Sequence, residues 1–326
     1  YGFLFGGTND NLEEIKAINP KTTPGLKLFL GSSTGNMLVD DPNTLKEIFS
    51  AFRLPIAVHC EDEQTIRANL AAYVKKFGDD IPIAHHPDIR SAEACYLSSS
   101  KAIALAKETG ARLHVFHLST ARETTLFQND VPLAEKQITA EVCIHHLWFS
   151  DEDYAKKGTH IKWNPAVKSA ADRAGLWEAL NDDRIDIIAT DHAPHTLEEK
   201  NQAYIKAPSG GPMVQHALAV MLECVHQGKI SIEKVVEKMC HNPAILFAIK
   251  ERGYIRTGYF ADLVLVDKNQ AHTITREGLL YKCGWSPLEG TTLRGAVTHT
   301  FLNGRLMYEN GNIKEAHHAK PLSFTR

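Results

Sequence analysis

The stretch Ile-Asp-Ile-Ile-Ala-Thr-Asp-His-Ala-Pro-His, residues 185–195, predicts a buried β-strand that ends in a group of polar side chains. Its first half is short and nearly continuously apolar, which is typical of a parallel strand buried on both faces. Asp191 and His195 follow directly after it. Because the carboxyl ends of the strands of a parallel barrel converge on one face, where active sites lie, these residues are candidates for a functional site.

Apolar runs of this kind recur along the chain, and amphipathic stretches separate them. The apolar runs cover residues 2–7, 26–30, 55–59, 112–117, 137–144 and 185–190, and the amphipathic stretches cover residues 12–18, 43–52, 63–77, 92–109 and 172–180. This alternation favours βα units and a parallel sheet. The expected fold class is α/β, a (β/α)8 barrel of the TIM type whose last helices lie in residues 213–227 and 231–247.

The C-terminal part of the chain follows a different pattern. Apolar and polar residues alternate over residues 258–267 and again over residues 296–303, and Asn303-Gly304 is a turn signal of β-hairpins. We therefore predict a barrel domain over residues 1–252 and a small β-sandwich-like appendage over residues 253–326.

Composition limits the function classes. The 326 residues carry a formal net charge of -3, which does not suggest a nucleic-acid or membrane surface. No apolar run approaches the roughly 18–20 residues that span a bilayer. The six cysteines include no CxxC pair and are typical of reduced thiols in a cytoplasmic protein. We expect a cytoplasmic protein with no nucleic-acid or membrane partner.

Four residues of the predicted strands suggest metal chemistry. Lys27 lies inside an apolar run, whereas His59, His117 and Asp191 each end one. A buried lysine needs a carboxylate partner or must lose its charge, and carbamylation by carbon dioxide would turn it into an anion that can bridge two cations. Imidazole and carboxylate are ligands that suit zinc. Together the four indicate most of a binuclear metal site, able to polarise an amide carbonyl and to supply hydroxide.

Taken singly, each residue has a simpler interpretation. Lys27 could form a salt bridge with a neighbouring strand, either histidine could be a hydrogen-bonded structural residue, and Asp191 could be a helix N-cap. Their joint occurrence at the ends of successive runs favours the metal site. Elsewhere, His145-His146 is expected to be structural, and the pairs His85-His86 and His317-His318 are expected to be exposed.

At this point the sequence resembles a known family. Residues 190–200, which contain Asp-His-Ala-Pro-His, are similar to the last barrel strand and loop of dihydroorotases, members of the metal-dependent amidohydrolases. The similarity continues, in order, through residues 58–61, 114–119, 141–147, 164–165 and 285–290. The Asp-His-Ala-Pro-His string is specific, and the single-histidine matches are weak alone.

The resemblance implies roles for individual residues. Lys27 would be the carbamylated lysine that bridges two zinc ions, and His59 and His117 would bind the second zinc. Asp191 would ligate the first zinc and act as general acid/base. Asn164 and His195, with the backbone of Gly211 and Pro212, would contact the substrate. Ser33 and Thr34 would belong to a flexible loop that closes over the substrate, although an ordinary βα loop is the alternative.

The sequence departs from the family at its beginning. The family's first strand carries His-x-His and, closely after it, a substrate-binding arginine, but these 326 residues contain no His-x-His. The bridging lysine belongs on the fourth strand, whereas Lys27 is on the second visible one. The first two βα units are therefore expected to be absent from this chain, on the order of 100 residues at about 30 residues a unit.

The resemblance implies dihydroorotase activity, the reversible cyclisation of N-carbamoyl-L-aspartate to L-dihydroorotate in de novo pyrimidine (UMP) biosynthesis. One alternative is a related cyclic amidohydrolase: dihydropyrimidinase, hydantoinase or allantoinase. Another is a catalytically silent dihydroorotase-like structural subunit, for example beside aspartate transcarbamoylase. A homodimer is the expected assembly.

Overall fold

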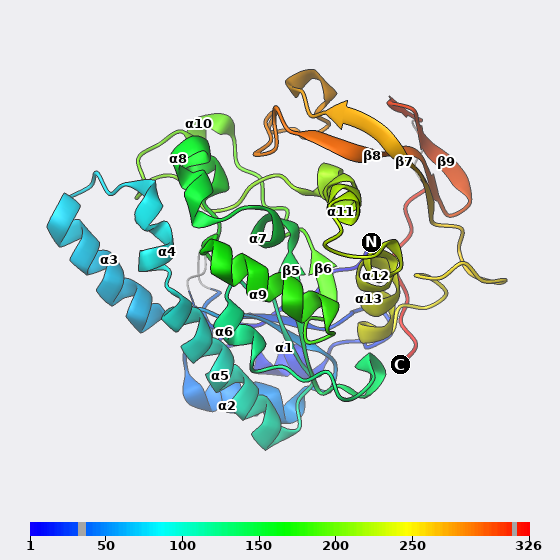
Figure 1. Cartoon of the computed structure of the whole chain (residues 1–326). Helices are drawn as coiled ribbons and strands as arrows, with labels where there is room; N and C mark the ends of the chain where they lie inside the picture. Colours follow the sequence, from blue (N-terminus) through cyan, green and yellow to red (C-terminus); the bar gives the residue numbers. More distant parts are fainter. Residues whose placement is uncertain (32–36, 315–317) are drawn as a thin grey trace.

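The computed structural model describes residues 1–31, 37–314 and 318–326, and its centre is a six-stranded parallel sheet (Figure 1). The strands follow one another in chain order: β1 (Phe5–Gly6), β2 (Leu26–Phe29), β3 (Ile56–His59), β4 (Leu113–Val115), β5 (Ile138–Cys143) and β6 (Ile187–Ala189). Each lies within one of the six apolar runs, so the prediction of a parallel α/β fold of the TIM-barrel kind is confirmed. In the described residues β1 and β6 are the two edges of the sheet, whereas a closed barrel has eight strands.

Helices cover the outer face of this sheet. The α-helices are α1 (Leu12–Lys16), α2 (Pro42–Ala51), α3 (Glu63–Phe77), α4 (His86–Ile89), α5 (Ala92–Thr109), α6 (Ala121–Thr124), α7 (Ile144–Trp148), α8 (Tyr154–Lys157), α9 (Ala170–Asn181), α10 (Leu197–Lys200), α11 (Ala217–His226), α12 (Ile232–Val236) and α13 (Asn242–Leu246). Local sequence fixes their ends. The Asp62 carboxylate accepts the Thr65 N–H at 3.1 Å where α3 begins, and Gly110, with φ +72°, follows the end of α5.

The core lies between the sheet and its helices. Leu26, Leu28, Ile56 and Val58 on β2 and β3 have no exposed surface. Burial of each such side chain stabilises the fold by roughly 1.5–3 kcal/mol. The sheet is therefore a rigid platform, and its carboxyl edge holds the loops that carry the candidate residues.

A second sheet of four antiparallel strands packs beside α11 (Figure 1). Its strands are β7 (Leu263–Thr273), β8 (Thr292–Leu302), β9 (Arg305–Glu309) and β10 (Asn312–Ile313). Asn303 and Gly304 join β8 to β9 with φ values of +51° and +80°, which confirms the predicted hairpin turn. The small β appendage is thus present.

The last residues leave this sheet and return to the barrel. The Leu322 N–H donates to the Tyr1 carbonyl at 2.7 Å, and the Thr325 N–H donates to the Ala248 carbonyl at 2.9 Å.

The division of the chain between residues 252 and 253 stays a prediction. Among the helices that the structure describes, none has the length and apolar character needed to cross a membrane.

Candidate metal-binding active site

Two of the predicted ligands are in direct contact at the carboxyl ends of neighbouring strands. His59 is the last residue of β3, and His117 lies two residues beyond β4. The Nδ1 atom of His59 lies 3.1 Å from the Nε2 atom of His117, and both side chains are 4% exposed. Burial lowers the pKa of both imidazoles below the usual range. Neutral rings with facing nitrogens are the form in which histidine binds a metal.

Asp191 lies two residues beyond β6, with its backbone in the left-handed region at φ +42°. His117 has the same kind of backbone, with φ +40°. A residue other than glycine is uncommon in this region, and such residues cluster at functional sites. Burial raises the pKa of Asp191 to about 6, with a further contribution from the charge of Glu141, whereas the charge of Lys27 opposes the rise.

Lys27 lies on β2, next to the edge strand β1, and is paired in register with Ala57 of β3 and Gly6 of β1. Its Nζ atom is 4.0 Å from the centroid of the Phe116 ring and 4.8 Å from that of Phe29. Burial lowers the pKa of Lys27 to about 8, although the negative charges of Glu141 and Asp191 act in the opposite direction. The amine of Lys27 is therefore neutral more often than that of an ordinary lysine. The neutral amine is the form that carbon dioxide modifies.

The arrangement fits a metal in part. Lys27 acts electrostatically on His59, His117 and Asp191, so the four predicted ligands share one region. The Nδ1 atom of His117 is buried without a hydrogen-bond partner among the described residues. In the same part of the chain, no three histidine, cysteine, aspartate or glutamate side chains form a preformed metal site. The structure thus brings together two imidazoles, with a buried lysine and a carboxylate nearby.

The predicted substrate-binding residues lie on loops beside Asp191. The Asn164 Oδ1 atom accepts a hydrogen bond from the Ser209 hydroxyl at 3.0 Å, and Gly211 forms an isolated parallel bridge with His192. The Nδ1 atom of His192 accepts the Met213 N–H at 3.1 Å. The residue 209–213 turn, which includes Pro212, is thereby tied both to Asn164 and to the loop after β6.

His195 lies further along that loop. Its Nδ1 atom is 3.7 Å from the Glu199 carboxylate, and its backbone carbonyl accepts the Trp285 indole N–H at 2.8 Å. His195 is thus held from the segment between β7 and β8, in a part of the chain that the resemblance also covers. Ser33 and Thr34, predicted to form a flexible loop, lie outside the described residues.

One expectation about the histidine pairs is wrong. His86 is fully buried, and its ring contacts the Tyr204 hydroxyl at 2.9 Å and the Trp163 carbonyl at 2.7 Å. The sequence pattern did not indicate burial, because both partners are distant in the chain. His145 and His146 are buried, and His145 stacks on the Trp163 ring at 4.2 Å; the structural role expected of this pair stays a prediction.

Sequence reasoning assigned no role to two buried carboxylates at the site. Glu141 on β5 is 3.1 Å from the His114 Nε2 atom and contributes negative charge at Lys27 and Asp191. Glu61, two residues beyond His59, has no exposed surface. Burial alone would raise the pKa of Glu61, but the charge of Arg90 and the contact with His59 lower it to about 2. The available signal was the position of both residues inside or directly after an apolar run.

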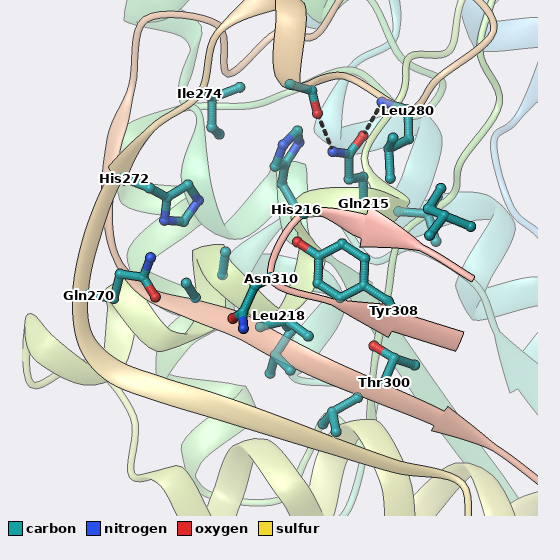
Figure 2. Close-up of a pocket in the computed structure, with 18 of the residues that line it drawn as sticks. Gln215, His216, Leu218, Gln270, His272, Ile274, Leu280, Thr300, Tyr308 and Asn310 are labelled. Carbon is teal, nitrogen blue, oxygen red and sulfur yellow. Dashed lines mark hydrogen bonds between the residues drawn. The ribbon is translucent and has the colours of Figure 1, made fainter. Parts of the chain in front are cut away.

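Two cavities are relevant to the site, one away from it and one beside the loop after β6. One of about 770 Å³ lies between α11 and the second sheet, and Figure 2 shows Gln215, His216, His272, Tyr308 and Asn310 among its lining residues. It contains none of the predicted site residues. Another, of about 480 Å³, lies beside the loop after β6 and is lined by residues that include His192, Pro194 and Tyr281.

Comparisons with known proteins identify the family of the chain. The sequence pattern described as the amidohydrolase family matches residues 38–307. A dihydroorotase of Halobacterium salinarum is 35% identical over 81% of this chain, which spans only 60% of that relative's length. A dihydroorotase of Pyrococcus abyssi is 32% identical over 96% of this chain, and the match covers 67% of that relative's length. The solved structure of an L-hydantoinase (dihydropyrimidinase) from Arthrobacter aurescens superposes with a TM-score of 0.89, at 28% identity, over 96% of this chain and 71% of that one. Since the family pattern covers most of the chain and the parallel sheet carries the expected residues at its carboxyl edge, the chain belongs to the amidohydrolase family, with dihydroorotases among its relatives.

Proposed function

We propose that this chain carries the catalytic barrel of a dihydroorotase. In the reaction, the carbamoyl nitrogen of N-carbamoyl-L-aspartate forms a bond to the carbon of the side-chain carboxyl group. One oxygen of that carboxyl group leaves as water, and the ring of L-dihydroorotate closes. The reverse reaction hydrolyses the cyclic amide. The observation that carries the proposal is the contact between the neutral, buried rings of His59 and His117 beside Lys27 and Asp191.

The residues of this chain support a zinc site of the family type. His59 and His117 would hold one ion, a carbamate on Lys27 would bridge it to a second ion, and Asp191 would ligate that second ion. Zinc bound there would polarise the reacting carbonyl and supply hydroxide near neutral pH. Carbamylation needs a neutral amine, and the lowered pKa of Lys27 favours that form.

Asp191 would move the proton. With its pKa raised to about 6, the carboxyl group can hold a proton on one oxygen and release it within the pH range of the cell. A general acid/base works best when its pKa is close to the working pH. Asp191 would accept a proton during ring opening and deliver it to the amide nitrogen, with the opposite transfer during cyclisation.

The loops beside Asp191 would bind the substrate. The backbone of Gly211 and Pro212 would face the pyrimidine ring, and the side chains of Asn164 and His195 would contact its polar groups. These loops are cross-connected by the Asn164–Ser209 and His192–Met213 hydrogen bonds, so the binding groups are held in place before substrate arrives.

The test measures zinc content and cyclisation of N-carbamoyl-L-aspartate on this chain and on a form extended at its N-terminus. The proposal expects zinc in both forms and turnover in the extended form. His59→Asn should lose zinc, whereas His145→Asn, a buried histidine stacked on Trp163, is the matched control and should retain it. Absence of zinc from both forms would contradict the proposal and favour the silent structural subunit.

A related cyclic amidohydrolase is the second candidate, because the superposition on the L-hydantoinase is extensive. Zinc without cyclisation, but with hydrolysis of dihydrouracil, hydantoin or allantoin, would assign the chain to that class. The cytoplasmic location, the role in pyrimidine biosynthesis, the homodimer and the association with aspartate transcarbamoylase remain predictions from the resemblance.

A further inference from the structure

The side of His59 that faces away from His117 meets a buried carboxylate. The His59 Nδ1 atom faces His117, and its Nε2 atom lies 3.1 Å from the Oε2 atom of Glu61. This is an ion-pair distance, and the His59 Nε2 atom has no other polar partner among the described residues. The other oxygen of Glu61, Oε1, has no hydrogen-bond partner in the described part of the chain. The Oε2 atom of Glu61 therefore lies within hydrogen-bonding distance of the His59 Nε2 atom.

Arg90 keeps this carboxylate ionised. It lies between α4 and α5, is only 8% exposed, and donates from its guanidinium to the same Oε2 atom. A buried carboxylate without a partner would take up a proton, whereas one paired with a guanidinium stays charged. Glu61 and Arg90 are 29 residues apart, and their charge pair joins the segment after β3 to the segment before α5.

The backbone of Glu61 is held as firmly as its side chain. A Cβ atom added at Gly31 would come within 1.9 Å of the Glu61 carbonyl oxygen, so the segment just after β2 packs directly against it. The next residue, Asp62, donates its N–H to the Ala94 carbonyl at 2.9 Å. Glu61 is therefore an acceptor whose carboxylate is held by Arg90 and whose backbone is held by two neighbouring segments.

A fixed carboxylate has a definite effect on a neutral imidazole. An ionised carboxylate only accepts hydrogen bonds, and a neutral imidazole carries one N–H and one lone pair. The hydrogen of His59 is therefore placed on Nε2, next to Glu61, and the lone pair is left on Nδ1, next to His117. Carboxylates that orient metal-binding histidines act in this manner, and their loss typically weakens metal binding 10–100-fold.

We infer that Glu61, held by Arg90, is a positioning residue that fixes the tautomer of His59 and directs its Nδ1 lone pair toward the metal. The inference rests on the proposed zinc site, because the tautomer of His59 matters for function only if its Nδ1 atom binds a metal ion. The competing interpretation is that Glu61 and Arg90 form an ion pair that supports the fold and leaves the histidine free to choose its tautomer.

The tautomer can be measured without any metal. Two-dimensional ¹H–¹⁵N spectra of the zinc-free chain distinguish protonated from unprotonated ring nitrogens, and a His59→Asn variant assigns the signals. We expect His59 to carry its hydrogen on Nε2, and Glu61→Gln to lose this preference. A hydrogen on Nδ1 in the unmodified chain would overturn the inference, as would an unchanged tautomer in the variant.

Zinc affinity, measured by competition with a chromophoric chelator, provides the second readout. We expect Glu61→Gln to weaken binding about 10–100-fold and Arg90→Gln to weaken it less. Glu123→Gln is the matched control. Glu123 is also a buried carboxylate, 2% exposed, but it accepts hydrogen bonds from Ser99 and Thr120. This control should change zinc affinity little.

The two readouts separate failure of the inference from failure of the proposed function. If the unmodified chain binds zinc and the Glu61 variant binds it equally well, the positioning role is wrong and the zinc site stands. If neither the unmodified chain nor its N-terminally extended form binds zinc, the zinc site is wrong, while the tautomer spectra still decide whether Glu61 controls His59. Equal losses of affinity in the Glu61 and Glu123 variants would assign the effect to the fold and contradict the inference.

Discussion

The Lys27 Nζ atom lies 4.0 Å from the centroid of the Phe116 ring, so the only lysine of the parallel strands β1–β6 rests on an aromatic face that follows β4, two strands away in the sheet. The ring attracts a cation, but far less strongly than a carboxylate in direct contact would. Burial therefore dominates, and the pKa of Lys27 falls to about 8.

We expect Lys27 to be carbamylated in a pH-dependent manner. Because the lowered pKa makes the amine neutral above pH 8 and largely protonated below it, the modification should increase as the pH rises from 6.5 to 8.5. The measurement is the carbamate signal in ¹³C spectra of protein incubated with ¹³C-bicarbonate. Lys27→Ala should remove the signal. Lys168→Ala, which removes another buried lysine, should retain it, and a signal that survives Lys27→Ala would disprove the assignment.

Asp191→Asn should separate catalysis from metal binding. In the N-terminally extended form, we expect zinc content close to that of the unmodified protein and turnover reduced on the order of 10²–10⁴-fold, since the amide cannot exchange a proton as a carboxylate does. Zinc analysis and initial rates of cyclisation provide the measurement. Turnover near the unmodified level would remove Asp191 from the acid/base role.

Gly210→Ala should damage the turn that contains the proposed substrate-binding residues. Gly210 has φ +124°, and an added Cβ atom would come within 2.3 Å of the Ala193 carbonyl oxygen. Gly228→Ala is the control, because Gly228 also has a positive φ, +69°, but has open space around its Cβ position. The control should cost roughly 1 kcal/mol of unfolding free energy, and Gly210→Ala clearly more.

Chemical denaturation of both glycine variants, together with the KM of the extended form, checks this expectation. We expect an increased KM in Gly210→Ala only. Similar losses of stability and an unchanged KM in both variants would show that the Gly210 turn tolerates a side chain and has no specific role in binding.

The attachment of the second sheet to the barrel should weaken in acid. The Glu223 carboxylate on α11 accepts the backbone N–H of Arg294 at 2.8 Å, and its oxygens also accept from Nε at 3.1 Å and from a terminal guanidinium nitrogen at 2.8 Å. The Arg294 hydrogen bonds lower the pKa of Glu223 to about 2. A lowered carboxyl pKa contributes stability that is complete above the unfolded value of 4.5 and is lost as the pH falls toward 2.

Glu223→Gln should therefore lower the melting temperature at pH 6 by on the order of 2–4 °C, and the difference from the unmodified chain should narrow between pH 5 and pH 3. Thermal melts of both proteins across this range provide the test. A difference that is constant with pH would show that the charge of Glu223 is not what joins α11 to β8.

The sequence was sufficient for features set by local patterns. Strands such as β3 and β6 were predictable because doubly buried strands are continuous apolar runs, and the Asn303-Gly304 hairpin followed from its turn residues. The burial of His86 and the pairing of Glu61 with Arg90 depend on partners 29 or more residues away, which no periodicity indicates. The left-handed backbone of His117 and Asp191 was also invisible, since neither is a glycine and tertiary contacts impose the conformation.

The left-handed backbone costs stability at two positions whose side chains the proposed reaction requires. His117 and Asp191, with φ +40° and +42°, occupy a conformation that glycine or asparagine would adopt more easily. A laboratory selection for heat resistance alone would thus reward replacements at the very positions whose side chains the proposed reaction requires. Engineering of this barrel for stability should keep both residues and seek stabilising substitutions elsewhere, because a higher melting temperature gained at His117 or Asp191 would come from loss of the site.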